Sequence, residues 1–243
     1  MVQLIFLFIA ALAPVAVLLW YINNKDKRQP EPTGWLLKAF GYGVVSILLT
    51  FVILIPLEAI FGSGADGDEY ASVWDAFASA FLSAAIPEEL AKLIMLWLLL
   101  RRNPFFDEKF DGIVYAVCVG MGFAGVENVM YLIEGLEDGS WVATGIARAL
   151  FSVPGHFLFA VLMGYYYSCY HFGIDGRRRT RAMILVAPIL AHGIYDGILF
   201  SLQVDEGIAA VGMILFLLFF NRLRKKGKER IEGLLASADN SGE

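Results

Sequence analysis

Two adjacent glutamates and a nearby lysine, Glu88, Glu89 and Lys92, lie within an apolar stretch that is long enough to cross a bilayer. An ionised side chain near the centre of a membrane helix costs roughly 2.5–3.5 kcal/mol on insertion scales, so such a group requires a partner or a function. Carboxylates that are shielded from bulk water can accept a proton from a water molecule or bind a metal ion. The glutamate pair is therefore the first candidate for a chemical site.

Three further apolar stretches contain polar side chains that could face this pair, namely Glu127 with Asn128, His156, and His192 with Asp196. With a rise of 1.5 Å per residue, all of these groups, and the glutamate pair itself, lie roughly 17–23 Å from the same end of their helices. We therefore predict that four helices bring their polar groups to one level of the membrane, somewhat past the midplane towards the outside.

Residue spacing predicts which of these side chains interact. Glu88 and Lys92 are four residues apart, as are His192 and Asp196, so each pair shares a helix face. Adjacent residues diverge by about 100° around a helix, so we expect that Glu88 and Glu89 cannot point at one atom without distortion. We predict that Lys92 neutralises Glu88 and that Glu89 acts on water.

Two helix-shaping features surround these groups. Pro87 removes a backbone donor just before the glutamate pair, and we expect it to kink the helix and to leave room for water. Gly120, Gly122 and Gly125 lie on the stretch that contains Glu127, and we expect them to allow close helix packing rather than ligand binding.

The composition indicates an all-α polytopic membrane protein, because 58% of the residues are hydrophobic and the mean hydropathy is +0.63. We expect one integral-membrane domain over residues 1–224 and a basic, then polar, cytoplasmic tail over residues 225–243 that is partly disordered. The expected spans, seven in number, are roughly Val2–Ile22, Trp35–Phe61, Val73–Leu100, Gly112–Ile133, Trp141–Phe172, Ala182–Leu202 and Gly207–Phe220.

Basic residues alternate between the loops. The first, third and fifth loops and the C-terminal tail contain Lys and Arg, whereas the intervening loops contain acidic residues and no Lys or Arg. This alternation predicts that the N-terminus lies outside and the C-terminus lies in the cytoplasm. Lys38 lies just inside the second span, next to the basic first loop, and the two basic residues deeper within spans are Lys92 and Arg148. For Arg148, as for Asn128 and Tyr131, we favour a structural role in helix packing.

Four motifs occur in order on successive expected spans: Ile86-Pro87-Glu88-Glu89-x-x-Lys92, Glu127-Asn128-x-x-Tyr131, Pro154-Gly155-His156 followed by Gly164, and His192-x-x-x-Asp196. Each motif alone is unspecific. Their order over roughly residues 80–200 resembles the PrsW family of bacterial and archaeal intramembrane proteases, which is related to the type II CAAX prenyl proteases and their bacterial relatives.

The resemblance implies a multi-pass peptidase in the cytoplasmic membrane of a prokaryote. Its implied partners are the lipid bilayer and a transmembrane protein substrate, and they include no nucleic acid. The implied reaction is site-1-type cleavage of an anti-sigma factor or a similar single-span protein. It implies that Glu88 and Glu89 are catalytic, together with His156 or His192, both of which we retain. The residues expected to support them are Lys92, Glu127, Asn128 and Asp196. The prenyl proteases have Asn where this chain has Asp196, and an ionised Asp would repel an oxyanion.

Two mechanisms remain open from the sequence. In the first, Glu88 or Glu89 is the general base, and His156 and His192 polarise the carbonyl or stabilise the oxyanion. In the second, both histidines and one carboxylate, Glu127 or Asp196, hold Zn²⁺ and leave a position for water. There is no His-Glu-x-x-His run. We prefer the metal-independent mechanism.

Other classes of function use the same residue types. Buried carboxylates and histidines also form proton or ion pathways in transporters. A membrane scaffold that has lost catalysis is a second alternative, although the presence of Glu88, Glu89, His156 and His192 disfavours it. A retinal-type receptor would need a lysine in the last span, and Gly207–Phe220 contains none.

Overall fold

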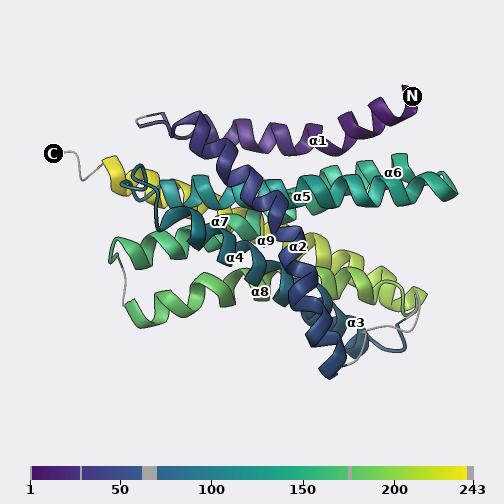
Figure 1. Ribbon diagram of the computed structural model, residues 1–243. Coiled ribbons are helices and arrows are strands. Elements are labelled where there is room, and N and C mark those ends of the chain that lie inside the picture. The colour runs from purple at the N-terminus through teal and green to yellow at the C-terminus, as the bar shows by residue number, and fades with distance from the viewer. Residues whose placement is uncertain (1, 28, 62–69, 175–176, 240–243) are drawn as a thin grey trace.

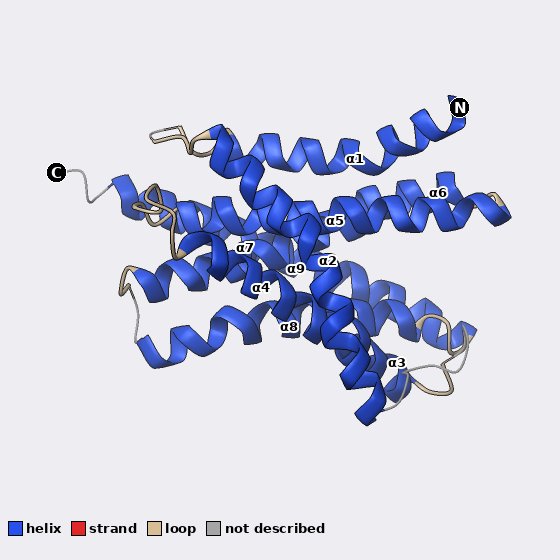
Figure 2. Ribbon diagram, viewed as in Figure 1, coloured by secondary structure: helices blue, strands red, loops and turns tan. Residues whose placement is uncertain are grey.

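The chain folds into a helix bundle in the computed structural model, which describes residues 2–27, 29–61, 70–174 and 177–239. Every regular element in these ranges is a helix, so the all-α prediction is confirmed (Figure 2). The elements, with π-helical turns labelled η, are α1 (Val2–Asn23), α2 (Thr33–Phe61), α3 (Val73–Ser79), η1 (Ala80–Ala85), α4 (Ile86–Leu100), α5 (Asp111–Asp138), α6 (Trp141–Ala147), η2 (Arg148–Ser152), α7 (Val153–His171), α8 (Arg177–Ser201) and α9 (Glu206–Asp239).

Six helical stretches within the described residues are long and apolar enough to cross a membrane. The remaining predicted span, Val73–Leu100, is continuous through α3, η1 and α4, and it contains Glu88, Glu89 and Lys92. The two chain ends lie at opposite ends of the bundle, as an odd number of crossings requires (Figure 1). Which end faces the cytoplasm remains a prediction from the basic loops.

The last helix is longer than the predicted span Gly207–Phe220. Helix α9 has 34 residues and runs on to Asp239, so at 1.5 Å per residue it is about 51 Å long. That length exceeds the roughly 30 Å hydrocarbon core of a bilayer. The basic part of α9 therefore extends beyond the membrane as a helix.

Helix α5 lies at the centre of the bundle and packs against α1, α2 and α7 (Figure 1). The close approach to α2 depends on Gly122, because a Cβ atom there would overlap the carbonyl oxygen of Phe40. A Cβ on Gly120 would lie 2.8 Å from the Cβ of Ala160 on α7. The close-packing prediction is confirmed for these two glycines, whereas Gly125 has its nearest neighbour at 3.5 Å, an ordinary contact.

Two π-helical turns precede the helices that contain the candidate site. η1 ends directly before α4, and Pro87 lies in the first turn of α4. η2 ends directly before α7, and Pro154 lies in the first turn of α7. Proline is tolerated in a first helical turn because the missing N–H has no obligatory partner there. The irregularity expected at Pro87 therefore takes the form of a π-helical turn before the proline.

Candidate active site

Lys92 on α4 is the centre of a buried polar cluster. Its Nζ atom donates to Glu88 Oε2 at 3.0 Å and to Glu89 Oε1 at 2.9 Å. The expectation that the two glutamates cannot reach one atom is wrong, because residues three and four positions before Lys92 both lie on its side of the helix. The ammonium group also lies 3.9 Å from the centre of the Phe123 ring. Lys92 therefore pairs with both glutamates, not with Glu88 alone, and leaves one of their two negative charges uncompensated.

His192 on α8 has a carboxylate beside each ring nitrogen. Nδ1 lies 3.0 Å from Glu89 Oε1, and Nε2 lies 2.9 Å from Asp196 Oδ2 and 3.9 Å from Glu88 Oε2. Carboxylates only accept hydrogen bonds, whereas a neutral imidazole donates from one nitrogen only. If Nδ1–H donates to Glu89, the lone pair of Nε2 faces the carboxylates of Asp196 and Glu88, which only accept. Either a second proton on Nε2 or a metal ion between these groups would remove that repulsion.

His156 on α7 meets the cluster from the opposite side. Its Nε2 lies 2.7 Å from Glu127 Oε2 on α5, and its Nδ1 lies 3.3 Å from Lys92 Nζ. Because the carboxylate accepts and the ammonium donates, Nε2 is the protonated nitrogen and the lone pair of Nδ1 faces Lys92 Nζ. The ring centres of His156 and His192 are 5.4 Å apart. The predicted meeting of four helices at one level is therefore present in the structure.

Arg148 in η2 anchors the α5 side of the cluster. Its guanidinium donates to Glu127 Oε2 at 2.7 Å and to Asn128 Oδ1 at 2.5 Å, and it lies 4.2 Å from the Tyr131 ring centre. Asn128 in turn donates to the carbonyl oxygen of Ala11 on α1 at 2.9 Å. Sequence analysis omitted Arg148 from the site. The available signal was that Arg148 and Lys92 are the two basic residues that lie within spans away from the basic loops.

The cluster is largely sealed from solvent and has an excess of negative charge. The side chain of Glu89 is fully buried, whereas those of Glu127 and Asp196 are 16% and 17% exposed. With neutral histidines, its four carboxylates and two basic side chains give a formal charge of −2. A divalent cation would neutralise this excess.

The donor atoms also fit a metal ion. Glu88, His156 and His192 each offer one ligand atom, and these atoms lie within 4.8 Å of one another. Two histidines and one carboxylate form a ligand set that catalytic zinc uses. The sequence-based ligand set had Glu127 or Asp196 as the carboxylate. In the structure Glu127 is engaged by Arg148 and His156, and Glu88 completes the group instead.

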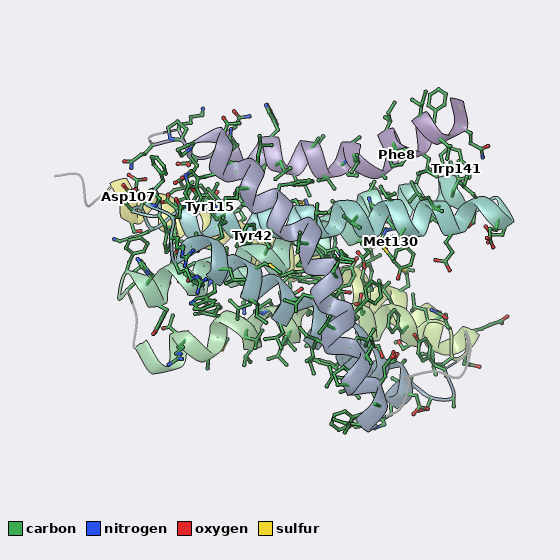
Figure 3. The ribbon with its side chains drawn as sticks, in the orientation of Figure 1. Phe8, Tyr42, Asp107, Tyr115, Met130 and Trp141 are labelled. Carbon is green, nitrogen blue, oxygen red and sulfur yellow. The ribbon has the colours of Figure 1, made fainter. Side chains whose placement is uncertain are left out.

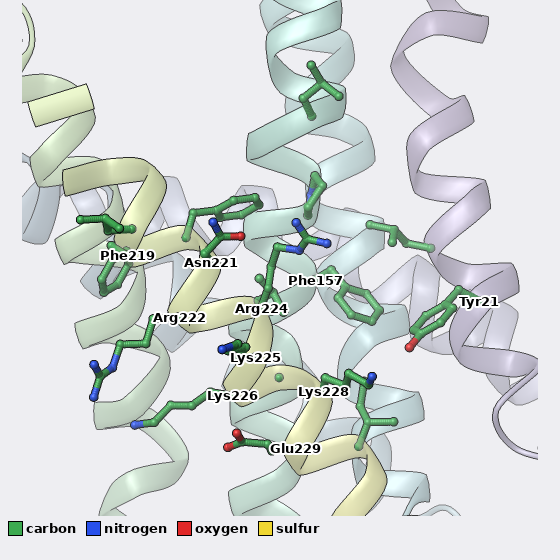
Figure 4. Close-up of a pocket in the computed structure, with 18 of the residues that line it drawn as sticks. Tyr21, Phe157, Phe219, Asn221, Arg222, Arg224, Lys225, Lys226, Lys228 and Glu229 are labelled. Carbon is green, nitrogen blue, oxygen red and sulfur yellow. The ribbon is translucent and has the colours of Figure 1, made fainter. Parts of the chain in front are cut away.

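A large hollow on the bundle is separate from this cluster. It has a volume of about 1520 Å³ and is lined by residues of α1, η2, α7 and α9, none of which belongs to the candidate site (Figure 4). Tyr21 and Phe157 line its apolar part, and Arg224, Lys225 and Lys228 line its basic part (Figure 4). The chemistry predicted from the sequence therefore lies between α4, α5, α7 and α8, and not in this groove.

Comparison with known proteins supports a peptidase. Residues 31–223 match the family model described as PrsW family intramembrane metalloprotease. The chain is 35% identical over 216 residues to the protease PrsW of Geobacillus kaustophilus (strain HTA426), covering 89% of this chain and 88% of the relative. It is 35% identical over 222 residues to the protease PrsW of Bacillus subtilis (strain 168), covering 91% and 94%, respectively. It is 31% identical over 245 residues to the protease PrsW of Clostridioides difficile (strain 630), covering 92% and 98%.

No solved structure matches the chain. The family match covers most of the sequence and includes all four motifs, from Pro87 to Asp196. The transporter and receptor alternatives have no comparable support. The chain belongs to the PrsW family of intramembrane proteases and is a membrane-embedded peptidase.

Proposed function

We propose that this peptidase is metal-dependent and cleaves a single-span membrane protein, such as an anti-sigma factor, within or beside its transmembrane segment. The observation that supports metal dependence most directly is the pairing of both histidines. His192 Nδ1 lies beside Glu89 and His156 Nε2 lies beside Glu127, so a carboxylate outside the proposed ligand set fixes one nitrogen of each ring. Metal-binding histidines are typically oriented in this way. Asp196 lies beside the second nitrogen of His192.

Glu88, His156 and His192 are the residues we propose to hold the ion. When bound, an ion such as Zn²⁺ would lower the pKa of a coordinated water and polarise the scissile carbonyl. Glu89 and Glu127 orient the two rings from outside this ligand set. Lys92 pairs with the two adjacent glutamates and compensates one of their two negative charges. The description of the family as metalloproteases agrees with this set of roles.

Peptide hydrolysis also requires a group that accepts a proton from water and returns it to the leaving amine. Of the four site carboxylates, Asp196 and Glu127 are the most exposed, and Glu127 already accepts from Arg148. We therefore assign proton transfer to Asp196: it accepts the proton as the water oxygen attacks, and it protonates the nitrogen as the C–N bond breaks. An Asp in this role also explains why the chain does not need Asn at this position.

The proposed substrate follows from the depth of the site. The reacting groups lie between helices that span the membrane, and the described connections between those helices are short. A scissile bond must therefore approach at the level of the bilayer, which a single-span protein with a locally unwound segment can do. The loop charges support a position of the reacting groups towards the extracytoplasmic side of the membrane midplane. The family resemblance suggests an anti-sigma factor as the substrate.

The test is cleavage of a purified single-span substrate by the full-length protein in lipid nanodiscs. We expect Glu88→Gln to abolish cleavage and to lower the bound metal content. Glu134→Gln removes an exposed carboxylate from the end of α5 and serves as the matched control, with wild-type cleavage expected. Cleavage by Glu88→Gln at the wild-type rate would reject the proposed site.

Metal dependence is tested separately on the wild-type protein. We expect a chelator to abolish cleavage and Zn²⁺ to restore it, with about one ion per chain in the active preparation. Full activity in a preparation that contains no transition metal would reject the metal assignment. The mechanism in which glutamate and histidine alone activate the water would then be correct.

A further inference from the structure

A second group of carboxylates lies far from the candidate active site, where the α1–α2 loop meets the start of α5. Asp26 and Glu31 belong to the loop, and Asp111 is the first residue of α5. The exposed fractions of the three residues are 4%, 7% and 0%, respectively. Each contributes a carboxylate oxygen, and these oxygens lie within 4.8 Å of one another. In Figure 3, Asp107 and Tyr115, which flank Asp111 in sequence, lie at the end of the bundle where the C-terminus lies.

The hydrogen bonds of this loop cluster satisfy only part of its oxygen atoms. Asp111 Oδ2 accepts from the backbone N–H groups of Asp107 at 3.0 Å and Glu108 at 2.6 Å. Glu31 accepts from the hydroxyl group of Tyr115. Asp26 Oδ2 and Asp111 Oδ1 are buried and have no hydrogen-bond partner. Buried polar atoms without a partner are rare in folded proteins, and such atoms often face a bound ion or an ordered water.

Within the part of the chain that the structure describes, the loop cluster also has no positive counter-charge. Among the described residues, no Lys or Arg forms an ion pair with any of its three carboxylates. Burial, and then the charge of Glu108, raises the pKa of Asp26 to about 6. Burial also raises the pKa of Glu31 to about 7, against the lowering effect of its hydrogen bond from Tyr115. Three carboxylates that repel one another in a buried place require either protons or a cation.

The chemistry of the donors selects the kind of cation. The loop cluster offers carboxylate oxygens and no imidazole or thiolate, unlike the Glu88, His156 and His192 group. Oxygen-only sites suit hard divalent ions, whereas nitrogen and sulfur donors suit zinc and other transition metals. Asp26 and Asp111 each have an unpaired oxygen that could bind the ion without breaking an existing hydrogen bond.

We propose that Asp26, Glu31 and Asp111 bind one hard divalent cation, Mg²⁺ or Ca²⁺, which fastens the α1–α2 loop to the N-terminal end of α5. The ion joins two segments that are about 80 residues apart in sequence. Because α5 also contains Glu127 of the candidate active site, the ion would stabilise the helix on which that site is built. This cation site does not depend on the proposed catalytic mechanism.

The test is thermal unfolding of the full-length protein in detergent after treatment with chelator, followed by titration with MgCl₂ or CaCl₂. At an ion concentration of about one hundred times Kd, we expect Tm to rise by roughly 5–10 °C. Asp111→Asn should abolish the rise, because Asn is isosteric but uncharged. Glu137→Gln is the control, since it removes an exposed carboxylate from the opposite end of α5 and should leave the rise intact. The ion with the larger effect at equal concentration identifies the preferred ligand.

A luminescence measurement keeps the proposal testable if Asp111→Asn does not fold. Tb³⁺ binds to hard-ion sites, and Tyr115, which contacts Glu31, should sensitise its emission. We expect Tb³⁺ emission in the wild type and in Glu88→Gln, competition by Mg²⁺ or Ca²⁺, and weaker emission in Tyr115→Phe. Three results would each overturn the proposal. They are no rise of Tm with either ion, an equal rise of Tm in Asp111→Asn, and loss of Tb³⁺ emission in Glu88→Gln alone.

Discussion

Glu89 Oε1 lies 3.0 Å from His192 Nδ1, although 103 residues separate the two in sequence. The same oxygen accepts a hydrogen bond from Lys92, and the Glu89 side chain is fully buried. This oxygen is therefore occupied by two partners. The arrangement favours an orienting role for Glu89, in place of the direct role on water that the sequence suggested, and it leaves Glu88 as the carboxylate that groups with both histidines.

Glu89→Gln should consequently impair the enzyme less than Glu88→Gln does. A glutamine still accepts from His192, but it lacks the charge that raises the basicity of the ring and balances Lys92. Loss of such an outer partner typically reduces metal affinity or activity by about 10–100-fold. We expect kcat/KM for a single-span substrate to fall by that factor, with weaker metal retention. Complete loss of cleavage with normal metal content would show instead that Glu89 contacts the water.

Arg148 should be essential for the stability of the site. Its guanidinium binds Glu127 and Asn128 at once, and all three are largely buried. Removing one partner of a buried ion pair typically costs about 3–5 kcal/mol because the remaining charge is uncompensated. We expect Arg148→Met to lower Tm by several degrees and to reduce cleavage. In the double variant Arg148→Met with Glu127→Gln, Tm should recover while cleavage stays low; no recovery would argue against this pairing.

The sequence was sufficient to predict the helical bundle and the meeting of its polar groups. Long apolar blocks indicated the spans, and a constant helical rise placed Glu88, Glu127, His156 and His192 at one depth. The sharing of Lys92 by both glutamates was not predictable from angles alone, because long side chains bend towards a common partner. Pro87 indicated irregular helix geometry in the sequence, but the π-helical turns before Pro87 and Pro154 depend on tertiary packing.

The loop cluster was missed for a different reason. Asp26, Glu31 and Asp111 are ordinary loop and helix-start residues in the sequence, and no spacing rule connects them. They meet only because the α1–α2 loop folds back onto the start of α5. Contacts between a loop and a distant helix end are set by the whole bundle, so local patterns cannot predict them.

Gly122→Ala should destabilise the bundle at the contact of α2 with α5. A Cβ atom at this position would overlap the carbonyl oxygen of Phe40, so one helix must move away. Small residues at such contacts allow the close approach on which membrane helices depend. We expect a clearly lower Tm for Gly122→Ala in detergent. Gly125→Ala is the matched control on the same helix, since the added atom has room there, and its Tm should be unchanged.

The stability of the chelator-treated protein should fall as the pH rises from about 5 to about 8. The folded-state pKa values of Asp26 and Glu31, about 6 and about 7, exceed the ordinary values of these carboxyls because both are buried. The next cause that raises the pKa is the negative charge of Glu108 for Asp26 and that of Asp26 for Glu31. A raised folded-state pKa means that the folded state binds more protons than the unfolded state over this range, so stability decreases with increasing pH.

The measurement is Tm against pH in EDTA. Glu31→Gln should flatten the curve, and saturating Mg²⁺ or Ca²⁺ should raise Tm most at pH 8, where the carboxylates are ionised. A Tm in EDTA that rises over the same range in wild type and in Glu31→Gln alike would contradict the inferred repulsion in the loop cluster.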